Sequence, residues 1–192
     1  MTSSNSHNVN NSLPKTLQQF ASQYIKDYQQ SHGHLPKTEQ DEQWPSPCEQ
    51  TEAADKGDVF WQPVAIGDEQ LGFDNVESAL KLTLHQDIKT YFTTFYSDSL
   101  NAKCNEGELS LLFAWNYDDF QRLQENLIGH ILMKQRLKQE ETIFFAVTDE
   151  EDTIISIANN TGAVWVEQVG CKPHKKIAGS IAEFIAQLTP VV

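Results

Sequence analysis

Residues 115–138 have the sequence WNYDDFQRLQENLIGHILMKQRLK, and they decide how the rest of the chain is interpreted. Apolar residues recur here at steps of three and four, as on one face of an amphipathic helix: Phe120, Leu123, Leu127 and Ile131. Asn116 is well placed to cap this helix, because its side-chain oxygen can accept hydrogen bonds from N–H groups of the first turn. The register fails after Leu132, since Lys134 would fall on the apolar face. The pattern therefore predicts a helix that ends near Met133.

The charges of this helix are ordered along its length. Asp118 and Asp119 lie in the first turn, where the positive end of the helix dipole stabilises carboxylates. Three cations lie at or beyond the predicted C-terminus, where positive charge is favoured: Lys134, Arg136 and Lys138. The face opposite the apolar one collects Asp118, Arg122, Glu125 and Asn126. The stretch is thus predicted to be a central and mainly architectural helix.

Short helices and one hairpin are predicted before the central helix. Pro14 is suited to open the first helix, which Gly33 would end. The acidic segment 39–58 is expected to be a solvated loop. Residues 59–64, VFWQPV, are expected to form an edge strand or an extended segment, because Pro63 has no N–H to donate. Further predictions are helices at 75–84, with Asp74 as a candidate cap, and at 85–95, and a hairpin of 100–104 with 108–113.

Three strands and a last helix are predicted after the central helix. Residues 142–147, TIFFAV, form an apolar run rich in β-formers. Residues 153–158 follow an acidic turn and residues 163–169 follow the turn sequence NNTG, which completes an antiparallel meander. The final helix can begin as late as Ser180 and stops before Pro190. Helices around a largely antiparallel central sheet give the fold class α+β.

Length and composition indicate one folded domain. The chain has 192 residues, of which 39% are hydrophobic, enough to bury a useful core. Residues 1–13, rich in Ser and Asn, are predicted to be a disordered leader, and residues 14–192 a single domain. No apolar run is long enough to span a bilayer, and the N-terminal sequence lacks the apolar segment of a secretion signal. We therefore expect the protein to remain in the compartment where it is made.

The three cysteines, Cys48, Cys104 and Cys171, lie far apart in the sequence. They form neither a CxxC pair nor a disulfide framework, which is typical of the reducing cytoplasm. Each is interpreted as a small apolar residue rather than as a nucleophile.

The charge balance is strongly acidic, with 27 Asp and Glu against 14 Lys and Arg and a net charge of −13. Such a surface repels nucleic acid and anionic lipid and attracts cationic partners. Plain solubility is a competing explanation, since many cytoplasmic proteins are acidic. Nucleic acid is therefore not expected as a partner.

No familiar catalytic or metal-binding pattern is present. The sequence lacks GxGxxG, GxxxxGK[ST], GxSxG and HExxH. His32 and His34 flank Gly33 at a predicted helix end, where a solvated turn is favoured over a metal site. His130 lies at the margin of the apolar stripe and is interpreted as a hydrogen-bonded, half-buried residue rather than a general base. The sequence thus predicts no catalytic, cofactor-binding or metal-binding residue and no small-molecule substrate.

A binding surface made of carboxylates is a better prospect. Seven candidates lie around the central helix and in the segments before it: Asp74, Glu77, Glu106, Glu108, Asp118, Asp119 and Glu125. On a concave surface they would converge without a lysine to neutralise them and attract a loop rich in Arg and Lys. Ordinary solvated faces explain the same charges equally well. Asp118 and Asp119 point apart in a first helical turn, so capping explains them better than acid–base catalysis.

A resemblance to a known family begins at residues 118–138, DDFQRLQENLIGHILMKQRLK. This run closely resembles the corresponding run of the Syd family, the SecY-interacting proteins of Gram-negative bacteria. Supporting matches occur in the family's order: PSPC at 45–48, WQP at 61–63, YFTTF at 91–95, and AEF at 182–184 with Gln187, Leu188 and Pro190. The resemblance covers nearly all of the chain after the leader, except the region 33–43.

The resemblance implies a non-catalytic cytoplasmic protein, loosely held on the inner face of the bacterial inner membrane through SecY, a subunit of the protein-export translocase. Syd proteins are expected to favour uncomplexed or improperly assembled SecY, and so to monitor or restrain the translocase. The implied fold is similar to the SUKH superfamily, with an acidic concave surface that receives basic cytoplasmic loops of SecY. Cytoplasmic loops of membrane proteins carry excess Lys and Arg, which agrees with this expectation.

Two other functions compete with this interpretation. An immunity-type protein of the SUKH superfamily would neutralise a toxin by covering its basic surface. A hydrolase that uses a carboxylate pair would depend on Asp118 and Asp119.

Overall fold

Five α-helices are present in the part of the chain that the structure describes, residues 12–67 and 71–192 of a computed structural model. They are α1 (Leu13–His32), α2 (Asp74–Leu80), α3 (Gln86–Thr93), α4 (Tyr117–Arg136) and α5 (Ile181–Ile185). The predicted leader falls outside the described ranges, except for Ser12 and Leu13, which form the start of α1. Within these ranges no helix has the length and apolarity required to cross a lipid bilayer.

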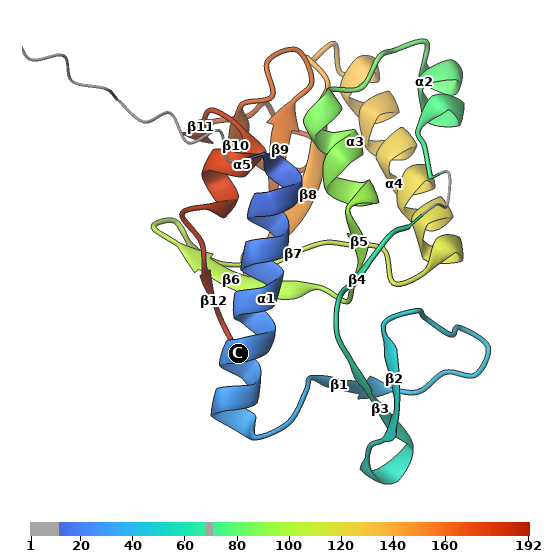
Figure 1. Cartoon of the computed structure of the whole chain (residues 1–192). Coiled ribbons are helices and arrows are strands. Elements are labelled where there is room, and N and C mark those ends of the chain that lie inside the picture. The colour runs from blue at the N-terminus through green and yellow to red at the C-terminus, as the bar shows by residue number, and fades with distance from the viewer. Residues whose placement is uncertain (1–11, 68–70) are drawn as a thin grey trace, which may run out of the picture.

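Seven antiparallel strands of the described residues form the main sheet, in the order β11-β10-β9-β8-β7-β6-β12 (Figure 1). They are β6 (Leu100–Cys104), β7 (Gly107–Leu111), β8 (Thr142–Thr148), β9 (Thr153–Ala158), β10 (Val164–Gln168), β11 (Lys175–Ala178) and β12 (Thr189–Pro190). The predicted hairpin is β6–β7 and the predicted meander is β8–β9–β10. Pairing of Leu109 with Thr148 joins the two into one sheet. The α+β prediction is thereby confirmed.

A smaller sheet of three strands forms where the sequence predicts a solvated loop at 39–58. The strands outside the main sheet are β1 (Lys37–Glu39), β2 (Glu49–Ala53), β3 (Asp58–Trp61), β4 (Val64–Ala65) and β5 (Phe95–Tyr96). Strand β3 pairs with both β1 and β2, so it is a central strand and the predicted edge position is wrong. Val59 and Trp61 alternate into the core, and the Trp61 ring lies 6.1 Å from that of Trp115. Pro63 follows the strand, where its missing N–H costs no ladder hydrogen bond.

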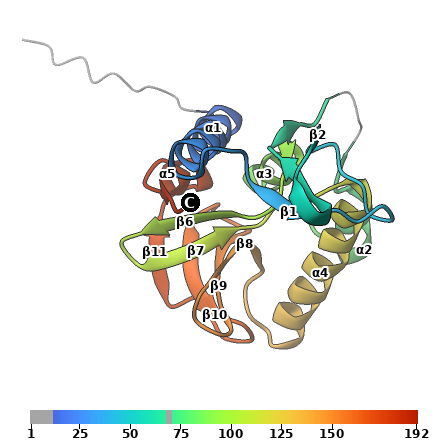
Figure 2. The same cartoon turned by 90° about the horizontal axis from the view of Figure 1, so that it is seen from below.

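Two neighbouring residues of β8 show how the main sheet is covered. Phe144 packs against His130 of α4, with ring centroids 5.4 Å apart. Phe145 packs against Tyr91 of α3 at 5.2 Å and against Phe184 of α5 at 5.9 Å. Helix α1 lies beside α3 and α5 (Figures 1 and 2). The sheet is therefore covered by α4 on the side of Phe144 and by α3 and α5 on the side of Phe145.

Helix α4 runs to Arg136, so the predicted end near Met133 is wrong. Lys134 is fully buried, and Glu167 of β10 lies buried beside it. The ammonium group donates to three acceptors: Gln139 Oε1 at 3.1 Å, Glu167 Oε2 at 3.2 Å and the carbonyl oxygen of Cys171 at 2.7 Å. An ammonium has three protons to donate, so none is left unsatisfied. The helix continues because Glu167 neutralises the lysine that interrupts its apolar face.

Glu167 is also linked by hydrogen bonds to Thr142 of β8 and, through Thr142, to His130 of α4. The Thr142 hydroxyl donates to Glu167 Oε1 at 2.8 Å. A hydroxyl has one proton, so in the 3.1 Å contact between Thr142 and His130 the donor is His130 Nε2–H, which also lies 3.5 Å from Glu167 Oε1. Burial alone would raise the pKa of Glu167, but hydrogen bonds from His130 and Thr142 and the charge of Lys134 outweigh it and lower the pKa. His130 is hydrogen-bonded, as predicted, and more deeply buried than predicted.

The helix caps agree in part with prediction. Asp74 begins α2 but does not cap it, because the N-cap is Phe73, which makes no side-chain hydrogen bond. His85 caps α3, since its Nδ1 accepts a backbone N–H of the first turn at 3.1 Å. Ser180 Oγ accepts the N–H of Glu183 at 3.1 Å at the start of α5, which confirms the later predicted start.

Candidate binding surface

Two turns bring carboxylates to the same end of the main sheet. The β6–β7 turn lies beside the β8–β9 turn, because β7 pairs with β8 next to them through Leu109 and Thr148. Four carboxylates in or next to these turns line one hollow of about 180 Å³: Glu106, Glu108, Asp149 and Glu150. We refer to these four residues and the depression between them as the acidic hollow.

The floor of the acidic hollow is apolar. It is lined by Leu109, Ile155 and Val166, from three different strands. An adjoining hollow of about 230 Å³ shares Glu108, Leu109 and Asp149 with it and reaches towards the C-terminus. Carboxylates above an apolar floor suit the side chains of Lys and Arg, whose aliphatic stems can pack while their charged heads are neutralised.

One member of the acidic hollow is neutralised within the fold. Glu106 forms an ion pair with Lys175 of β11, which lies beside the β6–β7 hairpin (Figure 2). The Glu106 and Lys175 side chains are 33% and 54% exposed, so the pair contributes roughly 0–1 kcal/mol. Glu108, Asp149 and Glu150 form no ion pair with any described residue. The predicted lack of a neutralising lysine is therefore wrong for Glu106.

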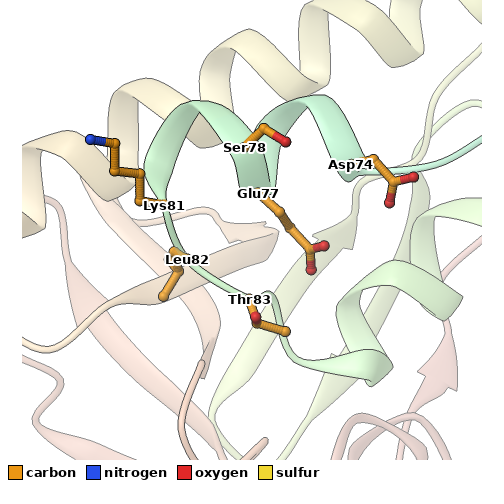
Figure 3. Close-up of a pocket in the computed structure, with 6 residues that line it drawn as sticks. All are labelled: Asp74, Glu77, Ser78, Lys81, Leu82 and Thr83. Carbon is orange, nitrogen blue, oxygen red and sulfur yellow. The ribbon is translucent and has the colours of Figure 1, made fainter.

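Asp74 and Glu77 line a separate hollow of about 380 Å³ under α2. Both carboxylates project to the same side of the helix, while Lys81 points away (Figure 3). Glu77 Oε1 accepts from Lys89 Nζ at 3.0 Å and from the N–H of Leu84 at 2.8 Å. The hydrogen bond from Lys89 lowers the pKa of Glu77. Glu77 is thus engaged within the fold, and Asp74 is the exposed carboxylate of this pair.

The three candidates on α4 differ in role. Asn116 Oδ1 accepts the N–H of Asp119 at 2.8 Å, and Asp119 Oδ2 accepts the N–H of Trp115 at 2.8 Å. This reciprocal pair caps the helix and confirms Asn116 as its N-cap. Asp118 and Glu125 are exposed on the helix surface. Two of the three carboxylates are therefore available to a partner.

The seven predicted carboxylates thus lie in three places rather than around one hollow. The tip of the β6–β7 hairpin and α2 lie on opposite sides of the molecule in both views (Figures 1 and 2). Helix α2 is joined to α4 by a hydrogen bond from Asn75 Nδ2 to Gln124 Oε1 at 3.0 Å, so those two groups are neighbours. The acidic hollow differs from both because its carboxylates come from two separate turns.

Asp149 and Glu150 are absent from the sequence-based candidates. The sequence marks residues 149–152 as an acidic turn between two strands. Their position beside Glu106 and Glu108 depends on the pairing of β7 with β8, which are separated in sequence by the whole of α4. Asp149 and Glu150 could have been identified by expecting the first strand after the central helix to pair with the last strand before it.

The remaining chemistry of the described residues is limited. They contain no group of three or more His, Cys, Asp or Glu arranged to hold a metal ion. Burial raises the pKa of the Cys48 thiol to about 11, so this cysteine carries no thiolate near neutral pH. What the acidic hollow offers chemically is attraction of cationic groups.

Comparison with known proteins gives the family of this chain. The family model for the Syd protein (SUKH-2) matches residues 14–190. Protein Syd of Colwellia psychrerythraea is 60% identical over 190 residues, which cover 93% of this chain and 94% of the relative. Protein Syd of Alteromonas mediterranea is 49% identical over 175 residues, with 91% and 94% covered, and that of Pseudoalteromonas atlantica is 41% identical over 184 residues, with 95% and 96% covered. Because the family model and these relatives match nearly the whole chain, the protein belongs to the Syd family.

Proposed function

We propose that this chain is a non-catalytic protein that binds the SecY subunit of the protein-export translocase on the cytoplasmic side of the bacterial inner membrane. Membership of the Syd family supports this partner, because the resemblance to that family implies an interaction with SecY. The chain would recognise uncomplexed or misassembled SecY and so regulate or quality-control the translocase. Its association with the membrane would be peripheral.

The acidic hollow is the observation that best supports the proposal. Glu108, Asp149 and Glu150 have no cationic partner among the described residues, and they surround an apolar floor. Cytoplasmic loops of membrane proteins are enriched in Lys and Arg. A basic SecY loop would place its charged heads against the carboxylates and its aliphatic stems on the floor, which gives both attraction and orientation.

A charge-reversal experiment tests this site. Glu108, Asp149 and Glu150 are replaced together by lysine, and retention of the purified protein is measured on vesicles of zwitterionic lipid that contain SecYEG. Three exposed ion pairs at roughly 0.5 kcal/mol each correspond to about a tenfold change in affinity, and reversal adds repulsion. We therefore expect at least a tenfold loss of binding.

The matched control reverses the same number of charges elsewhere, at Asp74, Asp118 and Glu125. We expect it to bind SecYEG within about threefold of the original protein, since exposed charges outside the contact act only through screened, long-range forces. If only the control variant loses binding to SecYEG, the contact with SecY lies on α2 and α4 instead of at the acidic hollow. Unchanged binding by both variants would contradict an electrostatic contact through either surface.

A further inference from the structure

The C-terminal end of α4 and the β10–β11 loop form a surface unlike the rest of the molecule. Gln139 Nε2 donates to the carbonyl of Gly170 at 3.1 Å, and Lys134 Nζ donates to that of Cys171 at 2.7 Å. These bonds hold the loop against the helix end. We refer to the resulting surface as the basic–aliphatic end: Leu132, Arg136, Leu137 and Lys138 from α4 and the residues after it, with Val169 and Lys172 from the loop.

Large apolar side chains are exposed at this end. Leu132 and Leu137 are each 47% exposed and Val169 is 45% exposed. Among the described residues only two other large apolar side chains are exposed to a similar degree, Tyr117 and Val192. Leu132 lies one helical turn before Arg136 and therefore on the same side of α4. Leu137 stands between Arg136 and Lys138, so an exposed aliphatic side chain is flanked by two exposed cations.

Three exposed cations lie at this end of an otherwise acidic molecule, with Glu140 and Glu141 beside them. Arg136, Lys138 and Lys172 are exposed and form no ion pair with any described residue. A hollow of about 390 Å³ lies between Lys138 and Lys172, with Trp165 in its wall and Glu140 as its one carboxylate. Unpaired cations around an indole and aliphatic side chains complement an anionic head attached to an apolar body.

We propose that the basic–aliphatic end binds directly to an anionic lipid bilayer, without the help of a protein partner. Aliphatic side chains would enter the boundary between headgroups and acyl chains while the lysines and arginine contact lipid phosphates. A net charge of −13 repels an anionic surface, so approach is favoured from this end, where Arg136, Lys138 and Lys172 are unpaired. The acidic turn 149–152 borders Val169, because the Val169 N–H donates to the Asp152 carbonyl at 2.9 Å. The approach is therefore made from the side of α4.

Vesicle flotation without SecY tests this proposal. The purified full chain is mixed, at low ionic strength, with vesicles of phosphatidylcholine alone or of equal parts phosphatidylcholine and phosphatidylglycerol. Three cations near an anionic surface raise partitioning by about a hundredfold. We expect flotation with the phosphatidylglycerol vesicles, and none with phosphatidylcholine alone. Flotation that fails with both compositions overturns the proposal.

Two variants separate a local contact from a general effect of charge. K138E/K172E should lower partitioning to phosphatidylglycerol vesicles at least tenfold, whereas K15E/K26E, which makes the same charge change on exposed positions of α1, should keep it within about twofold. L137S/V169S, which changes no charge, should also weaken partitioning. Equal loss in both lysine variants would contradict the proposed site. If the original protein binds soluble polyglutamate more tightly than the anionic vesicles, the proposal is wrong and the ligand of this surface is an acidic protein.

Discussion

Lys134 and Glu167 are two fully buried charges that neutralise each other at 3.2 Å. Removing one of them leaves the other without a counter-charge in the interior, and such a loss costs about 3–5 kcal/mol. We expect Lys134→Met to lower the free energy of unfolding by this amount, as measured by urea denaturation followed by circular dichroism.

The control for this prediction removes both charges together. Lys134→Met combined with Glu167→Gln removes both charges and keeps an amide oxygen that can accept from Thr142, so the double variant should recover most of the lost stability. If the double variant is less stable than Lys134→Met alone, the ion pair is not the reason for the single-variant loss.

The buried pair also shows what the sequence could and could not predict about α4. Periodicity predicted its start and its apolar face correctly, because those depend on local spacing and on capping by Asn116. It placed the end too early, because Lys134 is acceptable on the apolar face only beside Glu167, which lies 33 residues away. A lysine on the apolar face of a helix and a glutamate inside a strand are each anomalous alone, and together they indicate a buried pair.

At the scale of the elements, the β9–β10 turn is joined to the start of α3. The Asn159 side chain accepts the N–H of His85 at 2.7 Å and donates to the carbonyl of Thr83 at 2.8 Å. Gly162 of the same turn has φ of +74°, and a Cβ added there would lie 2.5 Å from the His85 ring. Because His85 caps α3, a change in this turn acts on a helix far away in the sequence.

Gly162→Ala should therefore destabilise the protein on two counts. A left-handed conformation costs a non-glycine residue about 1–2 kcal/mol, and displacement of His85 removes a helix cap as well. Gly129→Ala is the matched control, since Gly129 lies inside α4 with open space around its Cα, and alanine there should stabilise the helix by about 1 kcal/mol. Thermal denaturation should move in opposite directions for the two variants. A shift of the same sign in both would contradict this account.

Elements with a strong local pattern were predictable, and those that depend on distant partners were not. The β6–β7 hairpin and the β8–β9–β10 meander were predicted because apolar runs and turn residues define them locally. The β1–β3–β2 sheet was missed because β1 and β2, with sequences KTE and EQTEA, have no apolar alternation. These two strands form because their backbones pair with β3, and β3 is anchored by the buried side chains of Val59 and Trp61. The acidic hollow was only half predicted for the same reason.

Over the whole molecule, the β10–β11 loop lies between two surfaces of opposite sign. His174 lines the acidic hollow, and Lys172 lines the hollow of the basic–aliphatic end. A bilayer bound at the basic–aliphatic end would therefore have the acidic hollow close by. In that position the hollow would meet the cytoplasmic loops of a membrane protein. Two weak contacts made together raise the affinity beyond either alone.

This arrangement predicts that K138E/K172E affects binding to SecYEG only where anionic lipid is present. On vesicles of SecYEG with phosphatidylglycerol, the variant should bind at least about tenfold more weakly than the original protein, because one of two linked contacts is lost. With SecYEG in detergent, the two proteins should bind equally. Binding is compared by surface retention at the same ionic strength. Equal weakening in detergent would instead place Lys138 or Lys172 in the protein contact.

The edges of the main sheet have a consequence for handling the protein. At one edge, β12 covers β6, and the Val191 N–H donates to the Asn101 carbonyl at 3.0 Å. Pro190, the preceding residue, has no N–H to donate, and Lys175 and Lys176 occupy the other edge. Neither edge therefore offers a clean template for strand addition by a second copy. A chain shortened by its last four residues would expose β6 and become prone to aggregation during expression, so affinity tags belong after Val192 rather than in place of this segment.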